Sequence, residues 1–305
     1  MASPRAPVGC YLPYNEMEVD PIVLRDFAQA VEAMGYRHIA IADHVLGANR
    51  ASRPDWNFPY DSSDTFFEPL IAFAYLTGVT KAIALLSGVV VAPQRQAVLL
   101  AKQAATLDVL CGGRLKLGLG TGWNALEFEA LGMSFDDRGA RFDEQIAVMR
   151  RLWTEQHVAF EGRYHRIDDA GLAPMPVQRP IPIILAGNAR IAMDRAARIG
   201  DGWMPHLSSE GADDKIGRFH EAIVAAGRDP RDVPLYNLVH LGTGGTFVAG
   251  TLREPEDVVR DVEIWQRVGV GACCVNTMER GLFGVEAHLT ALRLIAEMLG
   301  LEAYC

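Results

Sequence analysis

The sequence lacks the features that would assign it to a membrane, secreted or nucleic-acid-binding class. No uninterrupted apolar segment approaches the roughly 20 residues that a membrane helix needs. The N-terminal segment has no apolar core of the kind that signal peptides carry. Lys and Arg form no run, and the net charge is −9, which argues against a nucleic-acid-binding surface. These absences predict a soluble, cytoplasmic protein that binds neither nucleic acid nor membrane.

Cysteine is scarce, and the chain has few of the motifs that carry metal or nucleophile chemistry. The cysteines are odd in number and form no CxxC pair, so they are expected to be buried thiols in a reducing compartment. The eight histidines show no HxH or HExxH spacing, and no metal site is predicted. No GxSxG occurs, which excludes a nucleophile elbow. The five cysteines are Cys10, Cys111, Cys273, Cys274 and Cys305.

Short apolar strands alternate with amphipathic helices along all 305 residues. Strands are expected at 8–12, 38–42, 83–91, 115–119, 180–186, 202–205, 234–241 and 271–276. Helices are expected at 21–34, 69–80, 97–111, 142–153, 190–199, 256–268 and 285–299, with a hairpin at 158–167. Eight such units predict an α/β fold, a (β/α)8 TIM barrel with insertions, as a single domain over residues 1–305. An open doubly wound sheet is the alternative, but its phosphate-binding fingerprint does not follow the first strand.

The rest of the chain is organised around residues 112–123, GGRLKLGLGTGW. Gly112 and Gly113 end a helix, residues 115–119 form a buried strand, and the GTG loop that follows carries nothing bulky. A dinucleotide-binding GxGxxG is not completed, because Trp123 stands where the third glycine belongs. The loop is either a plain turn after a strand or a place where a ligand approaches the backbone.

Candidate functional residues follow the strands, because barrel enzymes place their sites on the loops at the carboxyl ends. His44 is a candidate general acid, or else a hydrogen-bonded loop histidine, and Asp43 either orients the imidazole or accepts hydrogen bonds from nearby amides. Gly187-Asn188 precedes a helix N-terminus that suits a phosphate. The same two residues are also typical of a plain turn without a ligand. His206 and His240 are interpreted as packing or surface histidines. The aperiodic loop 46–66 has the length of a lid.

Several of these stretches together resemble the bacterial luciferase-like flavin monooxygenase superfamily, and within it the branch of oxidoreductases that use the deazaflavin coenzyme F-420. The strongest signals are GGRLKLGLGTGW and AARIGDGW, which together are specific to this superfamily. The other matching stretches are 39–45, 85–132, 138–144, 160–167 and 181–205. The loop 46–66 and the residues after 205 match weakly, so no substrate is transferred from the family.

The resemblance implies a (β/α)8 barrel that binds its flavin or deazaflavin at the carboxyl ends of the strands. Asp43 and His44 fall on the pair that lies beside the redox-active ring in the deazaflavin branch, and Gly88-Val89 falls on a bulge with a non-proline cis peptide behind it. The cofactor cleft is lined by Thr121 and Gly122. The phosphate is received by Ala186, Gly187 and Asn188.

The family's sugar-phosphate dehydrogenases carry a Glu where this chain has Trp123 and a Trp where it has Ala48, which argues against sugar-phosphate oxidation. The first interpretation is therefore hydride transfer between coenzyme F-420 and a small organic substrate, with His44 as the catalytic residue. The second is an FMN-dependent monooxygenase supplied with reduced flavin by a separate reductase. The third is a flavin-binding barrel without chemistry, which filling of the cleft by Trp123 or Trp56 would favour. The resemblance also predicts a homodimer, because members of the superfamily commonly form one.

Overall fold

A computed structural model describes residues 6–243 and 252–304, which form two compact units of non-contiguous chain. Met1–Ile41, Val79–Leu86 and Ile184–Cys305 make up unit 1, and Ala42–Gly78 and Ser87–Ile183 make up unit 2. Along the described residues, none of the helices has the length and hydropathy needed to cross a bilayer.

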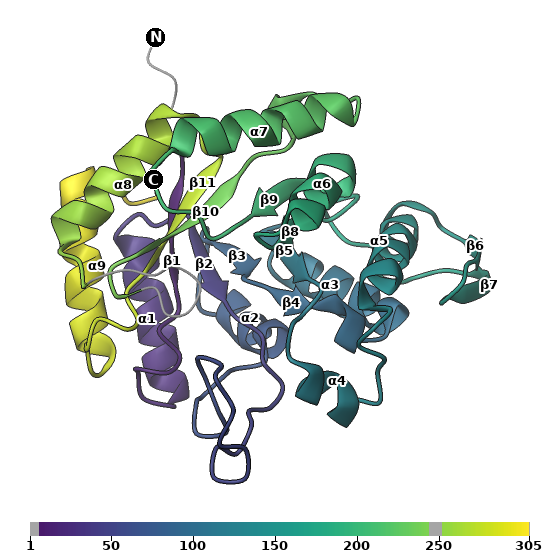
Figure 1. The fold of residues 1–305 in the computed structure, drawn as a ribbon, viewed down its shortest axis with the longest axis horizontal. Helices are drawn as coiled ribbons and strands as arrows, with labels where there is room; N and C mark the ends of the chain where they lie inside the picture. The colour runs from purple at the N-terminus through teal and green to yellow at the C-terminus, as the bar shows by residue number, and fades with distance from the viewer. Residues whose placement is uncertain (1–5, 244–251, 305) are drawn as a thin grey trace. The chain divides into compact units, whose positions relative to one another are not determined.

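Unit 1 is built on parallel strands that join the two ends of the chain. β1 (Val8–Tyr11) lies between β2 (His38–Ile41) and β11 (Ala272–Asn276), and β10 (Tyr236–His240) pairs with the outer side of β11. Figure 1 shows β1, in purple, beside the yellow-green β11. A second parallel pair joins β8 (Ile183–Ala186) to β9 (Gly202–Met204), and β3 covers Ala84–Ser87. The helices are α1 (Pro21–Ala33), α6 (Arg190–Ile199), α7 (Ala212–Ala225), α8 (Pro255–Arg267) and α9 (Val285–Leu299).

Unit 2 carries the stretch around which the sequence is organised. β5 (Leu115–Gly120) pairs in parallel with the short β4 (Val90–Val91), and α3 (Ala97–Leu110) leads into β5. The other helices are α2 (Pro69–Thr77), α4 (Ala125–Ala130) and α5 (Arg138–Thr154). An antiparallel hairpin of β6 (Val158–Glu161) and β7 (Arg166–Ala170) projects beyond α5 in Figure 1. Short 3-10 turns cover Ala92–Gln94 in unit 2 and Pro230–Asp232 in unit 1.

Local chemistry explains where these elements begin. The side chain of Asp20 accepts hydrogen bonds from the N–H groups of Ile22 and Val23, and Pro21 takes the first helical position of α1, as the sequence predicts. All four residues of β1 and of β2 are buried, the pattern of strands covered on both faces.

Along the described residues, eight parallel strands each precede a helix, which confirms the predicted α/β class and (β/α)8 order. The loop after β2 and the β6–β7 hairpin are its insertions. The structure differs from the prediction in several elements. α2 ends at Thr77 and not at 80, the strand 83–91 is split into β3 and β4, and α5 begins at Arg138 and not at 142. No range is predicted for α4 or α7. The description as a single domain stays a prediction.

Candidate functional site

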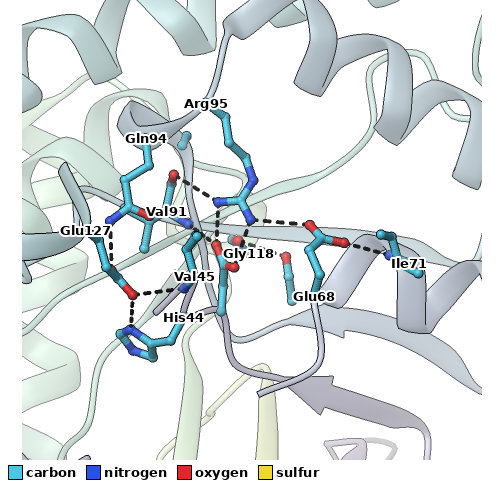
Figure 2. Close-up of polar contacts among 12 residues, drawn as sticks. His44, Val45, Glu68, Ile71, Val91, Gln94, Arg95, Gly118 and Glu127 are labelled. Carbon is cyan, nitrogen blue, oxygen red and sulfur yellow. Dashed lines mark hydrogen bonds and ion pairs between the residues drawn. The ribbon is translucent and has the colours of Figure 1, made fainter. Parts of the chain in front are cut away.

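Asp43, two residues beyond β2, is a buried anchor of unit 2. Its Oδ2 accepts hydrogen bonds from the Val91 N–H at 2.9 Å and from Arg95 Nη1 at 2.6 Å, and its Oδ1 accepts from Arg95 Nη2 at 2.8 Å. Arg95 also contacts Glu68, whose other carboxylate oxygen caps α2 at Ile71 (Figure 2). Burial alone would lower the pKa of Arg95, but Asp43 and Glu68 outweigh it and raise that pKa. Asp43 therefore fixes the chain next to His44 and does not orient the imidazole directly. Among the described residues, the two side chains have different hydrogen-bond partners.

His44 is held by a carboxylate that comes from α4, 83 positions further along the chain. Its Nδ1 lies 3.0 Å from Glu127 Oε1, which also accepts from the Val45 N–H at 2.9 Å (Figure 2). Gln94 Nε2 donates to the other oxygen of Glu127 at 2.8 Å. Burial alone would raise the pKa of Glu127, but these hydrogen bonds bring it below its ordinary value. Glu127 is thus ionised at neutral pH, and a carboxylate can only accept, so His44 carries a proton on Nδ1.

Aromatic side chains from the loop 46–66 and from Trp123 surround the imidazole. The hydroxyl of Tyr60 hydrogen-bonds to His44 Nε2, and the rings of Phe66 and Trp123 lie 4.8 and 5.7 Å from it, centroid to centroid. Phe58 stacks on Trp123 at 4.3 Å. The side chain of His44 keeps 12% of its surface exposed. The long loop predicted to be a lid therefore supplies Tyr60 as a direct partner of His44. It also supplies Phe58, which stacks on the indole of Trp123.

Two glycines of the organising stretch, Gly118 and Gly122, are required by close packing inside unit 2. A Cβ on Gly118 would lie 1.8 Å from the backbone oxygen of Ser87, and Ser87 Oγ donates to the Gly118 carbonyl at 2.8 Å. A Cβ on Gly122, where φ is +75°, would lie 2.5 Å from the side chain of Val91. The non-proline cis peptide expected from the family resemblance is present at Gly88–Val89. The half-buried Thr121 and Gly122 follow β5 in the loop, in the place the resemblance gives to the cofactor cleft.

Ala186, Gly187 and Asn188 lie in unit 1, at the junction of β8 and α6. Gly187 has a φ of +129°, and its carbonyl accepts from the indole N–H of Trp203 at 2.9 Å. Asn188 Oδ1 accepts from the backbone N–H of His206 at 2.7 Å. The N-cap of α6, Ala189, has no side chain that can accept from the first turn, so this helix N-terminus presents uncapped N–H groups. Its donor set suits an anion such as a phosphate.

The structure thus brings Asp43, His44, Gly88, Val89, Thr121 and Gly122 into unit 2 and Ala186–Asn188 into unit 1. No group of His, Cys, Asp or Glu in the part of the chain that the structure describes is arranged for a metal ion.

Sequence reasoning missed Arg95, Glu127 and Tyr60. Arg95 carries a detectable signal, because it is the single charged residue between Lys81 and Lys102. Glu127 and Tyr60 carry none, since each reaches His44 from a distant or irregular part of the chain.

Comparison with known proteins places these features in one family. Residues 11–248 match the family model described as luciferase-like monooxygenase. An uncharacterised protein of Mycobacterium tuberculosis is 31% identical over 260 residues, which cover 84% of this chain and 88% of the relative. An F-420-dependent hydroxymycolic acid dehydrogenase of the same species is 30% identical, over 73% of this chain and 59% of its own. An FMNH2-dependent dimethylsulfone monooxygenase of Pseudomonas putida is 34% identical, over 44% of this chain and 38% of its own.

Solved structures agree with the fold. The monooxygenase RslO1 of Streptomyces bottropensis superposes with a TM-score of 0.75 at 24% identity, over 96% of this chain and 98% of its own. An F-420-dependent secondary alcohol dehydrogenase, solved with an F-420–acetone adduct, gives the same TM-score at 17% identity, over 95% of this chain and 99% of its own. The fold is therefore the luciferase-like TIM barrel, and the chain belongs to the luciferase-like monooxygenase family, whose relatives include both F-420-dependent and FMN-dependent oxidoreductases.

Proposed function

We propose that this protein is an oxidoreductase that transfers a hydride between coenzyme F-420 and a small organic substrate, with His44 as its catalytic residue. The observation that carries the proposal is the hydrogen bond between Glu127 and His44. His44 belongs to the Asp43-His44 dipeptide, which the family resemblance places beside the redox-active ring in the deazaflavin branch. A relative named as F-420-dependent, 30% identical over 73% of this chain, supports the choice of coenzyme.

The residues present fit such a coenzyme. The uncapped N-terminus of α6 offers N–H donors for a phosphate. Gly187 has no side chain that would hinder the phosphate in approaching these donors. We assign contacts with the coenzyme to Gly88, Val89, Thr121, Gly122 and Ala186–Asn188. Asp43, whose buried carboxylate is occupied by Arg95 and Val91, is assigned to the same site as a positioning residue. When bound, a deazaflavin supplies two-electron hydride chemistry without readily activating oxygen, and the protein supplies position and electrostatics.

His44 is suited to move a proton. The ionised Glu127 accepts from Nδ1–H, which fixes the ring and stabilises positive charge on it. Nε2 is then the atom that gains and releases the proton, and Tyr60 is its neighbour. Tyr60 can both donate and accept, so it accommodates either protonation state of the imidazole. A positioned general acid of this kind contributes about 10²–10⁴-fold in rate.

Coenzyme choice is tested by titrating the purified protein with oxidised F-420 and, separately, with oxidised FMN, following fluorescence quenching. We expect F-420 to bind more tightly than FMN. Tighter binding of FMN would favour the second candidate, an FMN-dependent monooxygenase that receives reduced flavin from a separate reductase, which the Pseudomonas putida relative supports. Binding of neither would overturn both.

The third candidate, a barrel that binds a flavin without chemistry, is distinguished by activity. Trp123 packs near His44, yet the histidine keeps its carboxylate partner and part of its surface. Turnover of a surrogate acceptor with reduced F-420 supports the enzyme, and its absence in a protein that binds F-420 supports the carrier.

A further inference from the structure

Polar side chains occupy the carboxyl ends of three strands in unit 1. His206 lies two residues beyond β9, His240 is the last residue of β10, and Asn276 is the last residue of β11. His240 and Asn276 are register partners, and the rings of His206 and His240 lie 6.2 Å apart, centroid to centroid. The carboxyl ends of strands are where (β/α)8 enzymes bind their ligands. Sequence reasoning interpreted both histidines as packing or surface residues, but neither is fully exposed.

Hydrogen bonds around Asn276 determine which nitrogen of His240 carries the proton. The backbone N–H of Met278 donates to Asn276 Oδ1 at 3.0 Å, so the amide oxygen is fixed on that side. Asn276 Nδ2 then faces His240 Nδ1 at 3.4 Å. An amide nitrogen can only donate, and a neutral imidazole has one donor and one acceptor. His240 therefore accepts on Nδ1 and carries its proton on Nε2.

That Nε2–H group points to no acceptor in the part of the chain that the structure describes. The Nε2 atom is buried and has no hydrogen-bond partner among the residues that the structure describes. Buried polar atoms are bonded in the great majority of cases, and an exception calls for an unseen water or ligand. A ligand that satisfies this donor must offer an acceptor, such as a carbonyl or hydroxyl oxygen.

The surroundings favour a ligand without charge. Burial lowers the pKa of His206 to about 4 and that of His240 to about 3, so both rings are neutral at neutral pH. Arg253 donates to the His240 carbonyl at 3.3 Å, but its charge is paired with Asp261 at 2.8 Å. Because Asp261 neutralises Arg253, no free positive charge among these residues attracts an anion. The two neutral imidazole rings attract a cation only weakly.

The place of His206 is fixed by its neighbours, and an apolar space adjoins it. Asn188 Oδ1 accepts from the His206 N–H, and Asn237 both accepts from and donates to the backbone of Leu207. A small apolar cavity of about 10 Å³, the space of about one water molecule, adjoins His206, and the side chains that line it include Met204, Leu238 and Tyr11 but not His240. A ligand that reaches His240 Nε2 therefore lies outside this cavity, at the carboxyl ends of the strands.

We propose that His240, oriented by Asn276, donates a hydrogen bond from Nε2–H to an uncharged carbonyl or hydroxyl oxygen of a small, neutral organic group. The oxygen belongs either to the substrate or to a ring carbonyl of the coenzyme. The same geometry disfavours a metal ion at His240, because Nε2 carries the proton and an amide donor faces Nδ1. The proposal goes beyond the proposed function and does not depend on His44 or on which coenzyme is used.

The first measurement is side-chain ¹⁵N NMR of the full chain labelled at histidine. We expect His240 to be neutral at neutral pH, with its proton on Nε2. A proton on Nδ1 would overturn the proposal directly.

The second measurement uses probes that share one skeleton: cyclohexanone, cyclohexanol, cyclohexanecarboxylate and cyclohexylamine. Affinities are measured by ligand-observed NMR on the wild type, His240→Phe, which removes the donor, and His240→Gln, which restores an N–H donor. The neutral probes should lose about tenfold in affinity for His240→Phe and recover in His240→Gln. His220→Phe, at an exposed position of α7, is the matched control and should change nothing.

A parallel titration with oxidised F-420 and FMN identifies the source of the oxygen. If His240→Phe weakens a coenzyme and leaves cyclohexanone binding unchanged, the acceptor is the ring carbonyl; the reverse result assigns it to the substrate. If the charged probes bind as well as the neutral ones, or if His240→Phe changes no affinity in any arm, Nε2 contacts only water and the proposal is wrong.

Discussion

Removing the carboxylate of Asp43 should destabilise the protein far more than its loop position indicates. The side chain is 1% exposed and accepts three hydrogen bonds, two from Arg95 and one from the Val91 N–H. Arg95 is itself only 16% exposed, and its remaining anion, Glu68, lies at 3.3 Å. Breaking a buried pair by removing one partner costs about 3–5 kcal/mol, because the other charge stays buried and uncompensated. We therefore expect Asp43→Ala to lose about that much free energy of unfolding in urea.

Asp43→Asn should lose less, because an amide oxygen can still accept one of these hydrogen bonds. Asp26→Ala provides the control, since it breaks an ion pair with Arg25 that is exposed on the surface of α1, and a change below about 1 kcal/mol is expected. The transitions are followed by circular dichroism. A loss below about 1 kcal/mol for Asp43→Ala, comparable to an exposed pair, would refute the account of Asp43 as a buried anchor.

Four further outcomes are expected. His44→Ala should lower turnover about 10²–10⁴-fold while F-420 affinity, titrated on the same variant, stays within a few-fold; unchanged turnover would make His44 a structural residue. Gly187→Asp should weaken coenzyme binding by about tenfold, roughly 1.4 kcal/mol, whereas Gly217→Asp, in open space on α7, should not; equal affinities would place the phosphate elsewhere. Burial lowers the pKa of His288 from 6.5 to about 4, so the unfolded chain binds more protons between these values and stability falls as pH drops through them; His288→Gln should flatten this slope in urea titrations, and parallel slopes would contradict it. The chain should sediment as a homodimer at micromolar concentration, through helices of the first half of the barrel, and a monomer alone would refute this.

The fold was predictable where its causes are local. α1 begins after Asp20 because the cap and the proline are neighbours in the sequence, and α9 begins and ends at the predicted residues. α2 ends three residues before the predicted end, where Gly78 forms its C-cap and donates to the carbonyls of Tyr75 and Leu76. Beyond this cap, a contact that the sequence does not reveal holds the chain: the N–H groups of Lys81, Ala82 and Ile83 bind the carboxylate of Glu32, 49 to 51 positions earlier.

The apolar stretch 83–91 shows the limit of periodicity. Its composition predicts one continuous strand, but the chain turns at Gly88–Val89 and divides it into β3 and β4. Hydrophobic pattern carries no information on a peptide bond's isomer, and only the family resemblance indicated the site of the cis bond.

The candidate site was predictable in its centre and not in its support. The Asp43-His44 pair stands out because polar residues directly follow a buried strand. Glu127 belongs to a six-residue helix, and nothing in the sequence of this helix marks it as a functional residue. It contacts His44 only because the fold brings α4 to that side chain. Tyr60 lies in an aperiodic loop, where no spacing rule applies.

The adjacency of Asp43 and His44 separates what the protein needs in order to fold from what it needs in order to react. The two side chains share no partner: Asp43 bonds to Arg95 and Val91, and His44 bonds to Glu127 and Tyr60. Mutational libraries that vary the aromatic residues around His44 can therefore explore new acceptors while the catalytic histidine and the structural anchor one residue away stay in place. Libraries that include position 43 would be dominated by unfolded variants and would report on stability instead of chemistry.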